Sequence, residues 1–186
     1  EAIVPEEIVG LSVATRPDVL PSEVLSLLQE LASQKMLWVE LGLQTIHPTT
    51  AKYIRRGYSL DCFERAFHEL KEIGAEVVVH VILGLPGETR EDMLATVRYL
   101  ADLKIDGIKL QLLHVLKGTD LAREYLAGNF EVLTMDAYVS IVRECLTIIP
   151  PEMVVHRVTG DGPRELLLAP LWSTDKKRIL NQILRP

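Results

Sequence analysis

Cysteine is scarce in this sequence of 186 residues. The two cysteines, Cys62 and Cys145, lie far apart within helical patterns, and no C-x-x-C pair occurs. Within this sequence, that scarcity excludes a metal or redox cluster held by closely spaced cysteines. The expected role of both thiols is that of small hydrophobic side chains in the core.

Long apolar runs and an excess of positive charge are also missing. The longest apolar stretch, residues 77–85, is too short to cross a bilayer and contains His80. The formal net charge of −6 argues against general binding to nucleic acids or membrane surfaces. The first residues, E-A-I-V-P-E-E, are acidic where a signal peptide would be basic. We therefore expect a cytoplasmic protein without membrane attachment.

Several catalytic motifs are absent as well. The sequence contains no H-E-x-x-H, no G-x-G-x-x-G and no Walker lysine. No Ser-His-Asp set and no pair of catalytic carboxylates is visible. Ordinary hydrolases, metalloproteases and phosphate-loop proteins therefore lack support.

What the sequence does contain is a regular alternation of strand and helix patterns. The patterns predict strands at 8–15, 36–45, 76–83, 107–115 and 153–159. Helices are expected after Pro21, Ser59, Thr89 and Thr134, with shorter ones at 121–126 and 174–184. This alternation predicts right-handed βαβ units and a parallel sheet within a single domain over 1–186.

The predicted strands have one apolar face and one polar or small face. Because alternate residues share a face, Glu40 and Gln44 lie opposite Leu41 and Leu43. A doubly wound sheet would instead need apolar residues on both faces, since helices cover both. The pattern therefore favours an α/β fold of the partial parallel (βα) barrel type, similar to a TIM barrel, with a hydrated lumen.

Candidate site residues follow from this geometry, because parallel barrels place the active site at the C-terminal strand ends. The groups expected there are Arg16, Gln44, the loop 84–88, and His114 or Lys117.

Two polar residues sit deeper on their strands. Glu40 needs a partner: either Lys109 or Arg16 in an ion pair, or a ligand group. His80 is either a satisfied core histidine or a ligand contact.

Four segments, taken in order, resemble one enzyme family. They are S-V-A-T-R-P-D at 12–18, V-E-L-G-L-Q-T at 39–45, I-R-R-G at 54–57 and H-V-I-L-G-L-P-G-E-T at 80–89. Together they resemble the radical S-adenosylmethionine (SAM) enzymes, over roughly residues 9–122. The elongator-like and YhcC/YtqA-like bacterial groups look most similar, and oxygen-independent coproporphyrinogen oxidase looks more distant.

The resemblance implies a six-stranded partial barrel, with its third to sixth strands in this chain and a C-terminal extension at about 129–186. Gln44 matches a strand glutamine that contacts SAM, and Arg56 matches the arginine that meets the SAM carboxylate. Glu40 has no such family role and joins the set through its place on the strand. The expected cofactor-binding residues are Thr15, Arg16, Glu40, Gln44, Arg56, His80, Ile82, Gly84 and Leu85.

The sequence departs from the family in one large respect. Such enzymes hold a 4Fe-4S cluster on three cysteines, and this sequence has neither those cysteines nor the glycine-rich second-strand motif. Without the cluster, a SAM groove lacks the electron that cleaves the sulfonium bond to a 5′-deoxyadenosyl radical. The chain also begins without Met, almost directly at a strand. We therefore expect the C-terminal part of a longer enzyme, truncated at its N-terminus and inactive alone.

The longer enzyme would abstract hydrogen from its substrate. It would need an electron donor and a substrate that the sequence does not identify, a small molecule or a tRNA. The catalytic residues and the oligomeric state stay undetermined.

Two alternatives remain open. One is a conventional barrel enzyme in which Glu40 and His80 act as general acid and base. The other is a non-catalytic α/β binding module whose lumen is filled by its own salt bridges.

Overall fold

The fold is built on a five-stranded parallel sheet, in a computed structural model that describes residues 5–160 and 162–185. Neighbouring strands follow chain order, β1-β2-β3-β4-β6, without the reversal that marks a doubly wound sheet. This order, with helices between successive strands, confirms the predicted α/β fold of the parallel barrel type. The strands are β1 (Gly10–Thr15), β2 (Met36–Gln44), β3 (Glu76–Leu83), β4 (Gly107–Leu112) and β6 (Val154–Arg157).

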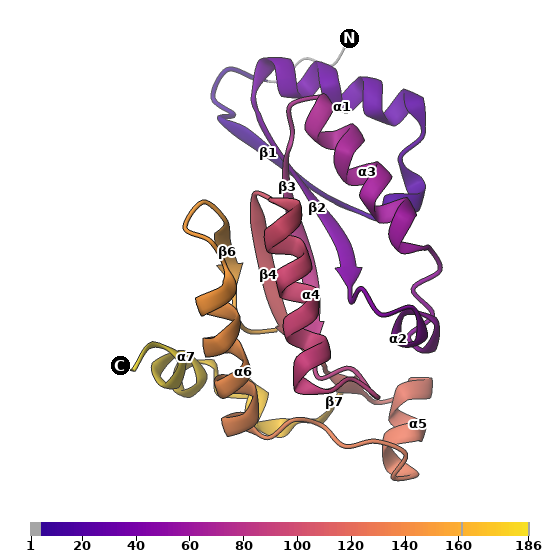
Figure 1. Cartoon of the computed structure of the whole chain (residues 1–186), viewed down its shortest axis with the longest axis vertical. Coiled ribbons are helices and arrows are strands. Elements are labelled where there is room, and N and C mark those ends of the chain that lie inside the picture. Colours follow the sequence, from indigo (N-terminus) through magenta and orange to yellow (C-terminus); the bar gives the residue numbers. More distant parts are fainter. Residues whose placement is uncertain (1–4, 161, 186) are drawn as a thin grey trace.

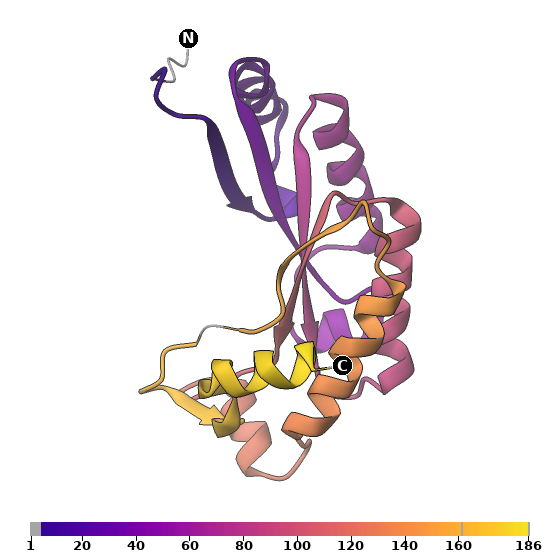
Figure 2. The same ribbon diagram turned by 90° about the vertical axis from the view of Figure 1, so that its left-hand side faces the viewer.

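The long helices cover one face of this sheet, and the other face stays open along much of its length (Figures 1 and 2). The longer helices are α1 (Ser22–Gln34), α3 (Leu60–Glu72), α4 (Arg90–Leu103) and α6 (Met135–Ile148). Short segments complete the fold: η1 (Pro17–Val19), α2 (Pro48–Tyr53), α5 (Asp120–Leu126), η2 (Leu171–Thr174) and α7 (Lys176–Leu184).

The hydrophobic core lies between the sheet and these helices, as the strand alternation predicts. On β2, Leu41 and Leu43 are fully buried, whereas Glu40 before them and Gln44 after them are only half-buried on the opposite face. The helices supply the other large buried side chains, among them Phe63, Leu70, Leu94, Leu100 and Tyr138.

The expected helix starts are confirmed by their caps. The side chains of Ser59, Thr89 and Thr134 each accept a hydrogen bond from a backbone N–H in the first turn. At Thr89 the cap is reciprocal, because the Asp92 side chain accepts from the Thr89 N–H. These caps fix where α3, α4 and α6 begin, and so fix the loops that precede them.

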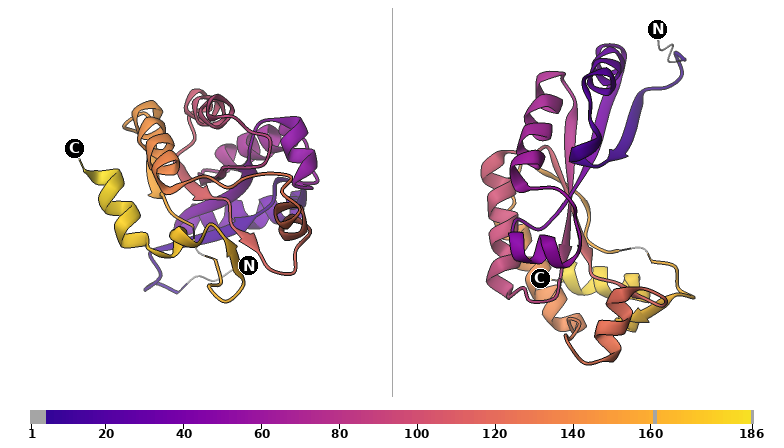
Figure 3. Two further views of the ribbon diagram at one scale, coloured as in Figure 1. Left: turned by 90° about the horizontal axis from the view of Figure 1, so that it is seen from below. Right: turned by 90° about the vertical axis from the view of Figure 1, so that its right-hand side faces the viewer.

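The predicted strand at 107–115 is longer than the one observed. The fourth strand ends at Leu112, and a separate strand, β5 (Val115–Leu116), pairs antiparallel with β7 (Leu167–Ala169). The sequence did not predict β7, because three residues are too few to show a two-residue alternation. This small second sheet lies beside α5, near the C-terminal ends of the main strands (Figure 3).

No helix within the described ranges, 5–160 and 162–185, is both long enough and apolar enough to cross a membrane.

Candidate functional site

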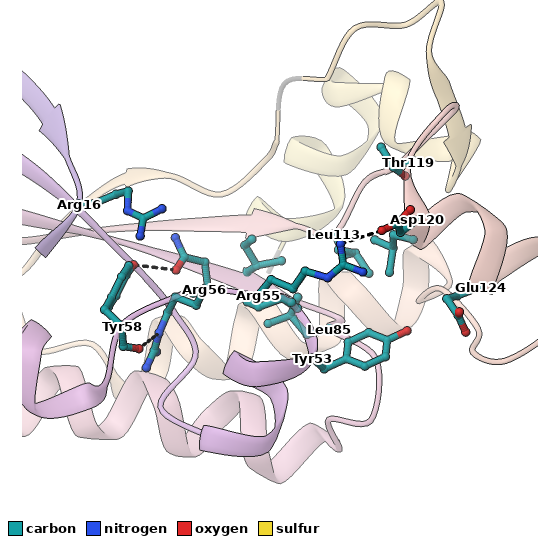
Figure 4. A pocket seen from close by; sticks show the side chains of 14 residues that line it. Arg16, Tyr53, Arg55, Arg56, Tyr58, Leu85, Leu113, Thr119, Asp120 and Glu124 are labelled. Carbon is teal, nitrogen blue, oxygen red and sulfur yellow. Dashed lines mark hydrogen bonds and ion pairs between the residues drawn. The ribbon is translucent and has the colours of Figure 1, made fainter. Parts of the chain in front are cut away.

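A cavity of about 700 Å³ lies at the C-terminal ends of the strands, where a parallel barrel places its active site (Figure 4). Its walls come from the strand ends, the segment 53–58 and helix α5. Five of the nine predicted cofactor-binding residues line it: Arg16, Gln44, Arg56, Ile82 and Leu85.

The cavity carries opposite charges on two walls and apolar side chains from other elements. The segment after α2 contributes Arg55 and Arg56, and α5 contributes Asp120 and Glu124. The apolar lining residues are Ile54, Ile82, Leu85, Leu113 and Leu121. Such a site suits a ligand that combines a flat apolar group with both an anionic and a cationic group.

One ion pair joins the two charged walls. The Nη1 atom of Arg55 lies 2.7 Å from Oδ2 of Asp120, and Figure 4 shows this contact between the two walls. Both side chains are largely exposed, so the pair contributes little to the free energy of unfolding. The pair shows that α5 lies beside the residues that follow α2.

Gln44 ends β2 in an unusual backbone conformation. Its φ of 66° lies in the left-handed region, and the pairing register with β3 shifts between Gly42 and Gln44. The Gln44 side chain folds over Gly42, since a Cβ added there would lie 2.5 Å from Nε2 of Gln44. The glycine of G-L-Q therefore makes the space that the glutamine amide occupies.

Arg56 is buried, and its guanidinium binds the protein backbone. Its Nη1 donates to the carbonyls of Leu43 and Thr45 at 3.1 and 2.6 Å, and its Nε donates to Tyr58 O at 3.1 Å. These bonds hold the turn that follows β2 and so support Gln44. The predicted contact of Arg56 with a ligand carboxylate stays a prediction.

Glu40 lies below the cavity within a polar network on the open face of the sheet. Its Oε2 accepts hydrogen bonds from Lys109 Nζ at 2.5 Å and His80 Nε2 at 2.7 Å. Burial alone would raise the pKa of Glu40, but these two hydrogen bonds outweigh burial and lower the pKa to about 2. Of the two ion-pair partners considered, Lys109 is the one that binds Glu40. Arg16 instead pairs with Asp18.

His80 links this network to the next strand. Burial lowers the pKa of His80 by more than the contact with Glu40 raises it, so the ring is neutral at pH 7. Because the Glu40 carboxylate can only accept, Nε2 carries the ring hydrogen, and Nδ1 accepts from Gln111 Nε2 at 3.1 Å. Both ring nitrogens of His80 are thus engaged by protein groups, and neither Glu40 nor His80 lines the cavity.

The remaining predicted residues also lie outside the cavity lining. Thr15 ends β1, paired with Leu41. Gly84 has a φ of 85°, and a Cβ there would meet Leu133 at 3.0 Å, so glycine permits the sharp exit from β3.

The two candidates beyond β4, His114 and Lys117, do not line the cavity. Lys117 Nζ donates to Glu165 O, and His114 packs beneath Gly160 and Gly162.

The described residues do not fit an iron–sulfur cluster. Within 5–160 and 162–185, no group of three or more His, Cys, Asp or Glu side chains is placed to hold a metal ion. Cys62 is half-buried on α3 and Cys145 is buried on α6. Burial raises the pKa of the Cys145 thiol to about 12, so the thiolate that binds iron is disfavoured there.

Several lining residues were not among the predictions. Tyr58 lies two positions beyond Arg56, and a lone aromatic residue after a glycine carries no periodic signal. Arg55 and Asp120 meet only because the fold brings α5 against the segment after α2. Opposite charges 65 positions apart offer no pattern in the sequence that would pair them.

Family models account for nearly the whole chain. One described as the Radical SAM superfamily matches residues 2–100, and one described as the Radical_SAM C-terminal domain matches residues 105–185. The chain therefore belongs to the radical SAM superfamily, which confirms the resemblance seen in its motifs. The prediction of a single domain stays a prediction.

Two bacterial proteins are clear relatives. The chain is 48% identical over 178 residues to the uncharacterized protein YtqA of Bacillus subtilis (strain 168), covering 96% of this chain and 55% of that protein. It is 38% identical over 177 residues to protein YhcC of Escherichia coli (strain K12), covering 95% and 57%. The chain thus spans a little over half the length of these curated relatives.

Solved structures support the fold. Elp3 of the archaeon Methanocaldococcus infernus, with an N-terminal deletion, superimposes with a TM-score of 0.78 at 24% identity over 95% of this chain and 43% of that chain. Coproporphyrinogen III oxidase (HemN) of Escherichia coli gives a TM-score of 0.59 at 18% identity over 73% and 31%. At these identities the likeness establishes the fold and nothing further.

Proposed function

We propose that the cavity binds SAM and that this chain is the C-terminal portion of a radical SAM iron–sulfur enzyme. One observation carries the proposal. The cavity unites five residues that the family motifs mark as cofactor contacts, and its two charged walls suit the carboxylate and the cationic centres of SAM.

Each part of the cavity has a complementary part of SAM. The Arg16 and Arg56 side of the cavity offers positive charge to the carboxylate. The Asp120 and Glu124 side offers negative charge to the ammonium and sulfonium groups. The apolar residues Ile82 and Leu85, which flank the C-terminal end of β3, offer a surface to the adenine ring.

The other predicted cofactor residues would act from beneath the cavity. Gly84 shapes the turn that presents Leu85, and Glu40 and His80 form the polar layer below Gln44. Thr15 precedes Arg16 at the end of β1. We propose that these four residues support the groove, with direct SAM contact reserved for the five lining residues.

In the parent enzyme, a 4Fe-4S cluster would supply the electron that cleaves SAM for hydrogen abstraction from substrate. This chain's described residues provide no ligands for that cluster, so we propose that the chain alone binds SAM without cleaving it. For the parent protein we propose a cytoplasmic location, an electron donor as partner, and a small molecule or a tRNA as substrate. The oligomeric state is likewise a property of the parent protein.

The acid–base alternative is less well supported. A carboxyl group with a pKa of about 2 stays ionised at neutral pH, so Glu40 is both a weak base and an unavailable acid. The His80 ring is held on both sides by Glu40 and Gln111. Neither group lines the cavity where a substrate would bind.

The proposal is tested by calorimetric titration of the purified chain with SAM. We expect saturable binding that Gln44→Ala and Arg16→Ala each weaken. Gln29→Ala, which removes an exposed amide from α1 remote from the cavity, is the matched control and should leave the affinity unchanged. Absence of saturable SAM binding by the wild-type chain contradicts the proposal. So does a SAM affinity equal to that of the wild type in both Gln44→Ala and Arg16→Ala.

A further inference from the structure

We infer that Tyr58 is a positioning residue that sets the orientation of the Gln44 amide for the ligand. The inference rests on the proposed function, because Gln44 is the amide that we assign to SAM binding. Tyr58 lines the same cavity, and it lies outside the four segments that resemble the family.

The ring of Tyr58 is fixed by its neighbours. The guanidinium carbon of Arg56 lies 4.9 Å from the ring centroid, and that of Arg16 lies 5.4 Å from it. Gly57 has a φ of 90°, and a Cβ there would lie 3.1 Å from Nη2 of Arg16. The chain thus reaches Tyr58 through a turn that glycine permits, and two cations hold the ring in place.

The Tyr58 hydroxyl lies between two acceptors at the C-terminal end of β2. Its oxygen is 2.5 Å from Gly42 O and 3.2 Å from Oε1 of Gln44. Figure 4 shows the dashed contact that runs from the Tyr58 hydroxyl. A phenol has a single hydrogen to donate, which these two oxygens share. Burial raises the pKa of Tyr58, so the hydroxyl keeps that hydrogen at neutral pH.

This contact decides which end of the Gln44 amide the ligand meets. With Oε1 bound to Tyr58, the amide nitrogen is the group left to donate to a hydrogen-bond acceptor on the ligand. Without the hydroxyl, the amide rotates about its last side-chain torsion, which has a broad, twofold preference. Tyr58 therefore acts on the ligand through Gln44, by keeping the amide in the donating orientation before binding.

A double-mutant cycle tests the inference with SAM as the probe. We expect Tyr58→Phe to weaken SAM binding about fivefold, the loss of one hydrogen bond that orders a binding group. In a Gln44→Ala background, the same change should weaken binding by less than about twofold, because the amide that it orients is gone. Gln44→Glu, which can accept from Tyr58 but cannot donate to the ligand, should lose as much affinity as Gln44→Ala.

Tyr99→Phe is the matched control. It removes a hydroxyl that donates to Glu64 at 2.6 Å, away from the cavity, and should leave the SAM affinity unchanged. Unchanged affinity in Tyr58→Phe, or an equal loss with and without Gln44, overturns the inference. Wild-type affinity of Gln44→Glu for SAM also overturns the inference. This outcome can be measured even if Tyr58→Phe does not fold. Failure of this inference can be distinguished from failure of the proposed function, because in the latter case the wild-type chain itself does not bind SAM.

Discussion

At the scale of single residues, Glu40 shows how the open face of the sheet tolerates a charge. A carboxylate on a sheet face needs partners, because an unpaired charge removed from water is costly. Lys109 supplies the opposite charge, and His80 supplies a neutral donor whose other nitrogen is engaged by Gln111. The network joins three neighbouring strands, β2, β3 and β4, below the cavity.

We therefore expect Glu40→Gln to change how stability depends on pH. The folded protein lowers the pKa of Glu40 from 4.5 to about 2, so its ionisation stabilises the fold above about pH 4.5. That stabilisation is lost as the pH falls toward about 2. The excess free energy of unfolding of the wild type over Glu40→Gln should shrink across this window in urea denaturation. Parallel pH curves for the two proteins contradict the network described here.

Gly42 gives a second residue-scale prediction. A Cβ at this position would lie 2.5 Å from Nε2 of Gln44, so Gly42→Ala should displace the amide and weaken SAM binding about fivefold or more. Gly107→Ala is the matched control, because its Cβ would crowd His156 instead, at 2.6 Å and away from the cavity. Titration with SAM checks both. Equal affinities of Gly42→Ala and the wild type would show that Gln44 does not contact the ligand.

How far the site was predictable depends on the kind of residue. Gln44 and the loop that contains Leu85 could be placed at the cavity because a strand end fixes where each emerges, whereas Ile82 was predicted through the resemblance to the family motif. Arg56 lines the cavity, but its bonds to backbone carbonyls depend on the exact path of the turn after β2. Tyr58 belongs to a loop without periodicity, so its contact with Gln44 could only come from the structure.

At the scale of elements, the start of α4 directly follows the loop that frames the cavity. Thr89 and Asp92 cap this helix reciprocally and so hold the end of the G-L-P-G-E-T segment. Thr89→Ala should lower the free energy of unfolding by about 1 kcal/mol. Thr147→Ala on the exposed side of α6 is the control, with an expected change within about 0.5 kcal/mol. Urea denaturation checks both, and equal effects of the two variants contradict this role of the cap.

The elements that the sequence predicted well are those with a strong local signal. The capped helices and the long strands β2 and β3 each carry many alternating or periodic positions. The pair β5–β7 could not be predicted, because its two strands have two and three residues and lie about 50 positions apart. Its formation depends on the path of the chain after β6, which local patterns do not encode.

At the scale of the whole molecule, the cavity is lined by residues from both parts of the chain that the family models match. Arg16 to Leu85 come from the part matched by the superfamily model, whereas Leu113 to Glu124 come from the part matched by the C-terminal domain model. The ion pair Arg55–Asp120 joins the two parts at the cavity. We infer that the C-terminal part completes the proposed SAM site and does not merely extend the barrel.

The chain spans a little over half the length of its curated relatives, so we expect the cluster ligands in the part of the parent protein that this chain does not cover. The full protein should contain a three-cysteine motif outside this chain, turn brown after anaerobic reconstitution with iron and sulfide, and release 5′-deoxyadenosine from SAM on reduction. This chain, treated in the same way, should release none, because its described residues hold no cluster ligands. Gln44→Ala in the full protein should lower the yield of 5′-deoxyadenosine while leaving the brown colour unchanged. A parent without clustered cysteines, or an active isolated chain, contradicts the division of labour proposed here: SAM recognition in this chain, and the cluster beyond it.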